Sequence, residues 1–199
     1  YGWASAMQQA TVQLGKLGVQ SIVNSMGVFV SAAFAAVNRI DDFAYIPQQN
    51  IAHAMTALMA QNKGAKKTNR IKAAFLCGIK IELIYGIFIF LLCFFLAHPL
   101  MQLFSSDPVV CKHGVTYLKL ISLMYLFPAV TNGVQGYFRG IGNLKITLIS
   151  SFVNMSVRVI FAAILVFHFS LQIEALPFSY LAGWIGMLVA EIPLLLKKF

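Results

Sequence analysis

The sequence is poor in charge, and acidic residues are especially scarce. Of its 199 residues, 11% are charged and only six are Asp or Glu, while 59% are hydrophobic. Soluble domains carry about 25% charged residues, so this composition excludes an ordinary soluble domain. The apolar residues form long runs without strict alternation, which favours helices over a membrane β-barrel. We therefore expect an all-α integral membrane protein.

The sequence also lacks the signatures of common enzymes and cofactor sites. It has no phosphate-binding glycine loop, no H-E-x-x-H and no G-x-S-x-G. Its three cysteines, Cys77, Cys93 and Cys111, are odd in number and lack metal-ligand spacing. We therefore expect no enzymatic activity, no metal and no cofactor. No signal peptide is visible and the chain starts at Tyr1 without a methionine, so we expect a fragment.

Six apolar segments follow one another along the chain. Each is near or above the roughly 20 residues needed to cross a bilayer. The second and fourth contain Pro47 and Pro128 and are long enough to bend. No linker is longer than about 15 residues, so residues 1–199 are expected to form a single six-helix membrane domain. The segments are approximately 4–25, 29–60, 72–97, 109–138, 144–168 and 176–196.

The basic residues are distributed unevenly between the two sides of the predicted bundle. The formal net charge of +9 does not indicate a nucleic-acid partner, because the basic residues lie at the membrane borders. One side holds nine Lys or Arg residues, whereas the other holds only Lys112. The positive-inside rule therefore predicts a cytoplasmic membrane protein with both chain ends cytoplasmic. The nine are Lys63, Lys66, Lys67, Arg70, Lys72, Arg139, Lys145, Lys197 and Lys198.

The first two segments each carry a polar stripe. At about 100° per residue, the polar residues of each segment share one part of a helical wheel. In segment one they are Gln9, Gln13, Lys16, Gln20 and Asn24. In segment two they are Asn38, Asp41, Asp42, Tyr45, Gln48, Gln49, His53 and Thr56, with Arg39 at the edge.

A polar stripe in a membrane helix must face protein or water, because an ionised group facing lipid costs several kcal/mol. We expect the two stripes to line a shared hydrophilic cavity, with Lys16 or Arg39 paired with Asp41 or Asp42. Alternatively, the stripes bond to each other as an interhelical contact and never meet a ligand.

Five charged or titratable residues within these segments admit more than one interpretation. Arg39 and Asp42 are i,i+3 neighbours and could pair locally, which would leave Asp41 on a different azimuth to carry a proton. A structural salt bridge in the outer vestibule is the alternative. Arg158 lies deep in segment five, so we expect pairing or a cavity location rather than lipid exposure. His53 is more typical of a hydrogen-bonded helix contact than of a proton relay.

Several phrases, taken in order, resemble the multidrug and toxic compound extrusion (MATE) family of antiporters. IVNSMG at 22–27 resembles the end of the family's seventh helix. AFAAVNRIDDFAYIP at 33–47 and AQNKGA at 60–65 resemble its eighth helix and the following loop. LFSSDP at 103–108 and GYFRGIGNLK at 136–145 resemble the joints before and after its tenth helix. The resemblance covers essentially the whole chain.

The resemblance implies a twelve-helix transporter of two six-helix lobes, with this chain as the C-terminal lobe and an N-terminal lobe as its partner. Such carriers exchange amphipathic, often cationic, organic compounds for protons or sodium ions through a cavity between the lobes. In one branch, acids on the seventh and tenth helices help to bind the coupling cation. Here segment one has no acid, and the tenth-helix position is Pro128.

The chain more closely resembles the branch of the DNA-damage-inducible exporter, whose principal proton-linked aspartates lie in the N-terminal lobe. The coupling ion, proton or sodium, is therefore left open. Two alternatives to drug export also stay open. The basic residues Lys16, Arg39 and Arg158 are compatible with a lipid-linked oligosaccharide flippase of the same superfamily, and a non-transporting membrane scaffold subunit would bury both stripes against partner helices.

Overall fold

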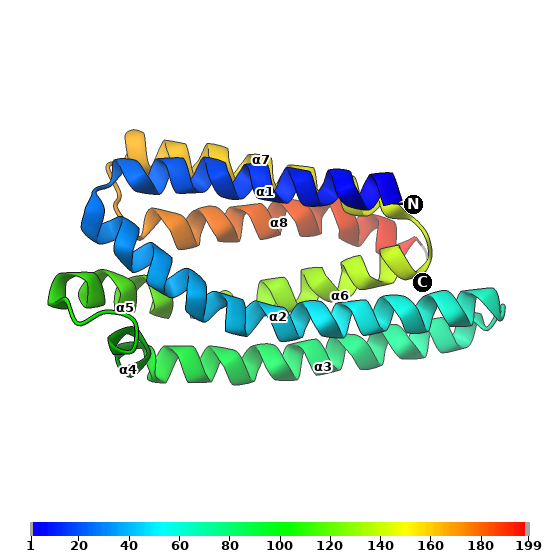
Figure 1. Ribbon diagram of the computed structural model, residues 1–199. Coiled ribbons are helices and arrows are strands. Elements are labelled where there is room, and N and C mark those ends of the chain that lie inside the picture. The colour runs from blue at the N-terminus through cyan, green and yellow to red at the C-terminus, as the bar shows by residue number, and fades with distance from the viewer. Residues whose placement is uncertain (1, 198–199) are drawn as a thin grey trace.

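The computed structural model describes residues 2–197, and every regular element in this part of the chain is a helix (Figure 1). The expected all-α class is confirmed. Tyr1, Lys198 and Phe199, which belong to the expected single domain, lie outside the described residues. The elements are α1 (Gly2–Ser25), α2 (Val28–Gly64), α3 (Thr68–Phe95), α4 (Ala97–Gln102), α5 (Pro108–Ser122), α6 (Leu126–Gly140), α7 (Leu144–Phe167) and α8 (Ala175–Leu196).

Five of the six expected segments correspond to one long helix each, namely α1, α2, α3, α7 and α8. The expected segment 109–138 is instead a pair, α5 and α6, bent by 51°. The short helix α4 follows α3. By length and composition α3, α7 and α8 can cross a membrane, and the bent pair adds a fourth span. Helices α1 and α2 are long enough, at 24 and 37 residues, but their polar stripes make them less apolar.

Three helix ends follow from local chemistry. Gly27 adopts a φ of 101°, a conformation that favours glycine, where α1 gives way to α2. Asp107 caps α5 by accepting hydrogen bonds from the backbone N–H groups of Val109 (2.7 Å) and Val110 (3.3 Å), and Pro108 occupies the first helical turn. Gly142 has a φ of 76° in the tight turn between α6 and α7.

The helices form two groups that lie side by side in Figure 1. Helix α7 packs against both α8 and α1, whereas α2 packs against α3 and α6, with α5 beside it. Contacts of α8 with α6 and α5 join the two groups. Both described ends of the chain lie at the same end of the bundle, together with the α2–α3 and α6–α7 connections (Figure 1). The predicted alternation of the loops is therefore confirmed, and the basic connections share one end.

Within the second group, α2 and α6 form a tightly packed contact. A Cβ atom at Gly136 would lie 2.8 Å from the carbonyl oxygen of Ala52, and one at Gly140 would lie 2.9 Å from the carbonyl oxygen of Thr56. Across the same contact the Thr56 hydroxyl donates to the Gly136 carbonyl at 3.1 Å. This close approach fixes the C-terminal half of α2 against α6 and so determines which residues of that half face the inside of the bundle.

Candidate functional site

The polar stripe of α1 lies on the surface of the bundle. Gln9, Gln13, Lys16 and Asn24 are exposed, and Gln20 is half-buried and donates to the Asn24 side chain at 2.8 Å. The opposite face of α1, which includes Gly15 and Gly18, packs against Met155 and Val159 of α7. The stripe therefore meets no partner within the described bundle except its own neighbours along α1.

The polar arc of α2 is divided by the packing. Arg39, Asp42, Gln49 and His53 are exposed. Asp41 and Gln48 are buried, with 7% and 2% of their surfaces exposed, and Tyr45 is half-buried. One helix thus presents polar groups both to the interior of the bundle and to its surface.

The ion pairs expected within the stripes do not form. No salt bridge joins Lys16 or Arg39 to either aspartate within residues 2–197, and Arg39 and Asp42 are both exposed. Asp41 instead accepts a hydrogen bond from the Tyr125 hydroxyl. The physical reason is that Asp41 points between the helices, where the start of α6 supplies the donor, whereas the two basic side chains lie on the surface.

Asp41 belongs to a buried cluster of aromatic and charged side chains between the two helix groups. The Arg158 guanidinium of α7 lies 3.5 Å from the ring centre of Tyr180 and 5.7 Å from that of Trp184, both on α8. Tyr45 stacks on Trp184, with ring centres 6.4 Å apart, and meets the Tyr125 ring edge-on.

Arg158 is buried, with 7% of its surface exposed, so the expectation that it does not face lipid is confirmed. Its Nε has no hydrogen-bond partner among the described residues. The guanidinium lies close enough to Asp41 to act on it electrostatically, yet the two form no salt bridge. Stacking on aromatic rings is therefore the main visible stabilisation of this cation.

A second internal polar network escaped the sequence analysis. The Gln8 side-chain amide donates to Ser151 at 2.8 Å and to Gln135 at 3.3 Å, linking α1, α7 and α6. Gln8 directly precedes Gln9 and so points about 100° away from the α1 stripe. A glutamine just beside a polar stripe was the only available signal, and its partners are more than 100 residues away.

Glu191, near the end of α8, does not pair with the basic residue Lys197 at the helix end. The carboxylate is fully buried and accepts a hydrogen bond from the Ser150 hydroxyl at 2.6 Å, whereas Lys197 is exposed and Lys198 lies outside the described residues. Packing of α8 against α7 turns Glu191 inward, and the lysine at the helix end stays in solvent.

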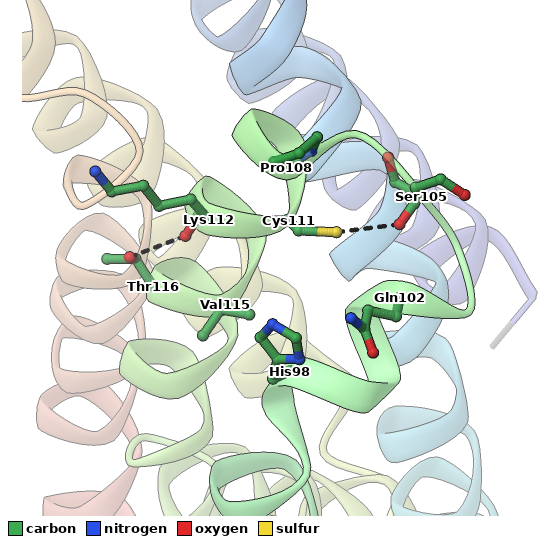
Figure 2. A pocket seen from close by; sticks show the side chains of 9 residues that line it. His98, Gln102, Ser105, Pro108, Cys111, Lys112, Val115 and Thr116 are labelled. Atoms are coloured by element: carbon green, nitrogen blue, oxygen red, sulfur yellow. Dashed lines mark hydrogen bonds between the residues drawn. The ribbon is translucent and has the colours of Figure 1, made fainter.

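A separate pocket of about 730 Å³ lies between α4 and the start of α5, at the end of the bundle opposite the chain ends (Figures 1 and 2). Figure 2 shows His98 of α4 beside Val115 of α5, whereas the Lys112 side chain extends away from α4. The Cys111 thiol donates to the Ser105 carbonyl at 3.0 Å. None of the predicted site residues lines this pocket. It is therefore distinct from the polar faces of α1 and α2.

Residues 4–164 match the family model MatE. The chain is 24% identical over 192 residues to a probable multidrug resistance protein, NorM, of Thermotoga maritima, aligning 96% of this chain with 40% of that protein.

Two solved structures of multidrug resistance MATE transporters share the fold. An outward-facing conformation superposes with a TM-score of 0.91 at 19% identity, covering 99% of this chain and 45% of that chain. An inward-facing conformation superposes with a TM-score of 0.84 at 19% identity, covering 99% of this chain and 46% of that chain. The chain thus spans less than half the length of each of the three proteins.

Proposed function

Because the chain belongs to the MatE family, we propose that it is the C-terminal half of a cation-coupled antiporter that exports drugs or other organic cations by alternating access. The coupling cation would be a proton or sodium. A second half, the N-terminal lobe, would be the partner, and both ends of this chain would be cytoplasmic. The chain itself is a multi-pass membrane protein, with three helices and one bent pair long and apolar enough to span a bilayer.

The observation that carries the proposal is that α1 and α2 each expose polar side chains. Elsewhere the surface of the bundle is strongly apolar, with side chains such as Ile84 and Phe95 of α3 and Val189 of α8 between 67% and 73% exposed. Apolar faces suit lipid, but Lys16, Arg39 and Asp42 do not. Water in a cavity shared with a second half would solvate them, while mixed apolar and polar walls would accept varied amphipathic substrates.

Two alternatives make different demands on the same exposed polar side chains. A lipid-linked oligosaccharide flippase would need a basic cavity, but Arg158 is buried among aromatic rings, which leaves only Lys16 and Arg39 of the three basic residues on the surface. A scaffold subunit would bury these side chains against partner helices. Transport of organic cations against lipid-linked sugars in vesicles separates the first alternative from the exporter.

Thiol labelling separates a water-filled cavity from a dry interface. In the complete transporter made cysteine-free, Gln49→Cys should react with a membrane-impermeant maleimide, because Gln49 is exposed on the polar face of α2. Gln48→Cys, one residue away and buried, is the matched control and should react at least about tenfold more slowly. Equal protection at both positions would favour the scaffold subunit, because a dry interface excludes the reagent.

Asp42→Asn tests the role of the exposed carboxylate. In the complete transporter it should reduce efflux of a cationic dye severalfold without lowering expression, because it removes a negative charge from the proposed cavity wall while keeping the side-chain shape. The control is Asp107→Asn, which also removes an exposed carboxylate but keeps a residue that caps helices well. Unchanged dye efflux in Asp42→Asn would reduce Asp42 to a structural residue.

A further inference from the structure

Glu82 is a fully buried carboxyl group without a partner. It lies in the middle of α3 with 0% of its surface exposed, and neither carboxylate oxygen has a hydrogen-bond partner. The two other buried acids of the described chain each have one, since Asp41 accepts from Tyr125 and Glu191 accepts from Ser150. Burying an unpaired carboxylate is prohibitively costly, so Glu82 requires something that neutralises it.

The neighbouring glycines of α3 show where Glu82 points. Gly78 and Gly86 lie four residues to either side and therefore share its face of the helix. A Cβ atom at Gly78 would collide with Met55 of α2. One at Gly86 would lie 3.3 Å from the Ala129 side chain of α6 and 3.5 Å from the carbonyl oxygen of Tyr125, the residue just before α6. Glu82 thus projects into the seam where α2, α3 and α6 meet.

The surroundings of Glu82 offer no cluster of carboxylate, histidine or cysteine ligands for a metal ion among residues 2–197. A sodium or divalent cation needs several oxygen ligands around it, and no group of three acidic, histidine or cysteine side chains that could hold a metal occurs among residues 2–197. The side chains that the seam glycines Gly78, Gly86 and Gly133 face include Met55, Ile79 and Ala129, which are apolar. A single carboxyl group in such surroundings can be neutralised by one small ligand, a proton.

The following ionisable groups of α2, α3 and α6 have other partners or are exposed, so none of them neutralises the Glu82 carboxylate. On α3, Tyr85 donates its hydroxyl to the Phe43 carbonyl at 3.3 Å, and Lys80 is exposed. Tyr125, at the start of α6, is bonded to Asp41 of α2. Further along α6, Tyr137 packs on Phe75, and Arg139 donates to the Gln135 carbonyl.

We propose that Glu82 is the residue of this half that binds and releases the coupling proton; this inference rests on the proposed antiport function. The protonated side chain fits the closed seam of α2, α3 and α6, whereas the carboxylate requires water and so favours an opened seam. Protonated Glu82 therefore favours the closed arrangement of the helices, and ionised Glu82 favours the opened one. Such a difference between two conformations is the condition for coupling a ligand, here the proton, to a conformational change. The glycines at the seam let the helices approach and separate without large side chains interlocking.

Melting of the purified complete transporter as a function of pH tests the proton site. Because the packed seam takes the protonated form, wild type should lose stability as pH rises above about 4.3, the ordinary pKa of a glutamate, by about 2 °C per pH unit while Glu82 stays protonated in the folded protein. Glu82→Gln, neutral and similar in shape, should lose this dependence and melt above wild type at high pH. Glu174→Gln, at the half-buried start of α8, is the control and should follow wild type. A Glu82→Gln profile parallel to wild type overturns the inference.

Transport in vesicles supplies the second measurement. Dye uptake driven by a pH gradient should fall about tenfold or more in Glu82→Gln and recover partly in Glu82→Asp, which restores a carboxyl group. A sodium-driven activity that depends on Glu82 would overturn the choice of proton, and a full pH-driven rate in Glu82→Gln would overturn the role of the residue. If wild type moves no organic cation at all, the proposed function fails, yet the melting profiles still decide whether Glu82 binds a proton.

Discussion

Arg158→Ala is expected to destabilise this half of the transporter by about 3–5 kcal/mol, because it removes a desolvated cation–π contact and leaves a cavity. The guanidinium lies 3.5 Å from the Tyr180 ring centre and also faces Trp184. No solvent can fill the space cheaply, since Trp184 is itself buried. The effect should appear as a fall of roughly 10 °C in the melting temperature of the purified transporter.

Two further variants identify the cause. Arg158→Lys keeps the charge but loses the planar group that stacks on the rings, so it should recover less than half of the lost melting temperature. Lys80→Ala removes a positive charge from an exposed position of α3 and should leave melting unchanged. Full recovery in Arg158→Lys would show that the charge alone matters, and a loss in Lys80→Ala equal to that in Arg158→Ala would contradict the assignment to the aromatic cluster.

Gly136→Leu is expected to prevent stable packing of α6 on α2. Even the Cβ atom of alanine would lie 2.8 Å from the Ala52 carbonyl oxygen, and backbone cannot move aside as a flexible side chain can. Overpacking typically costs about 1–3 kcal/mol, so Gly136→Ala should fall in that range and the larger leucine should exceed it. Yield of folded protein and melting temperature measure both variants.

Gly186→Ala is the matched control, because it makes the same change in another helix of the bundle. Its Cβ atom would meet Val153 at 3.5 Å, an ordinary van der Waals distance. The gain in helix propensity should then leave α8 as stable as before or slightly more stable. If Gly136→Ala behaved like Gly186→Ala, the α2–α6 contact would not be as close as the structure places it.

Local sequence determined much of the architecture. Hydrophobic runs located the long helices, because a backbone in lipid must satisfy its hydrogen bonds within a helix or barrel. Asp107 and Gly142 marked a helix start and a tight turn through chemistry that involves only adjacent residues. The alternation of the spans placed the basic loops on one side of the bundle, and several short sequence segments in the family's order pointed to the family. Each of these signals lies within one helix or one loop.

Tertiary structure alone decided the inside of the bundle. Asp41 and Asp42 are adjacent in the chain and equally polar, yet one is buried against Tyr125, which lies 84 positions away, and the other is exposed. Glu82 gave no periodic signal because a single acid in an apolar helix has no pattern. A helical wheel gives the angle between residues but not the direction of the neighbouring helices. The burial of each polar group, its partner and the bend between α5 and α6 therefore depend on contacts between distant segments.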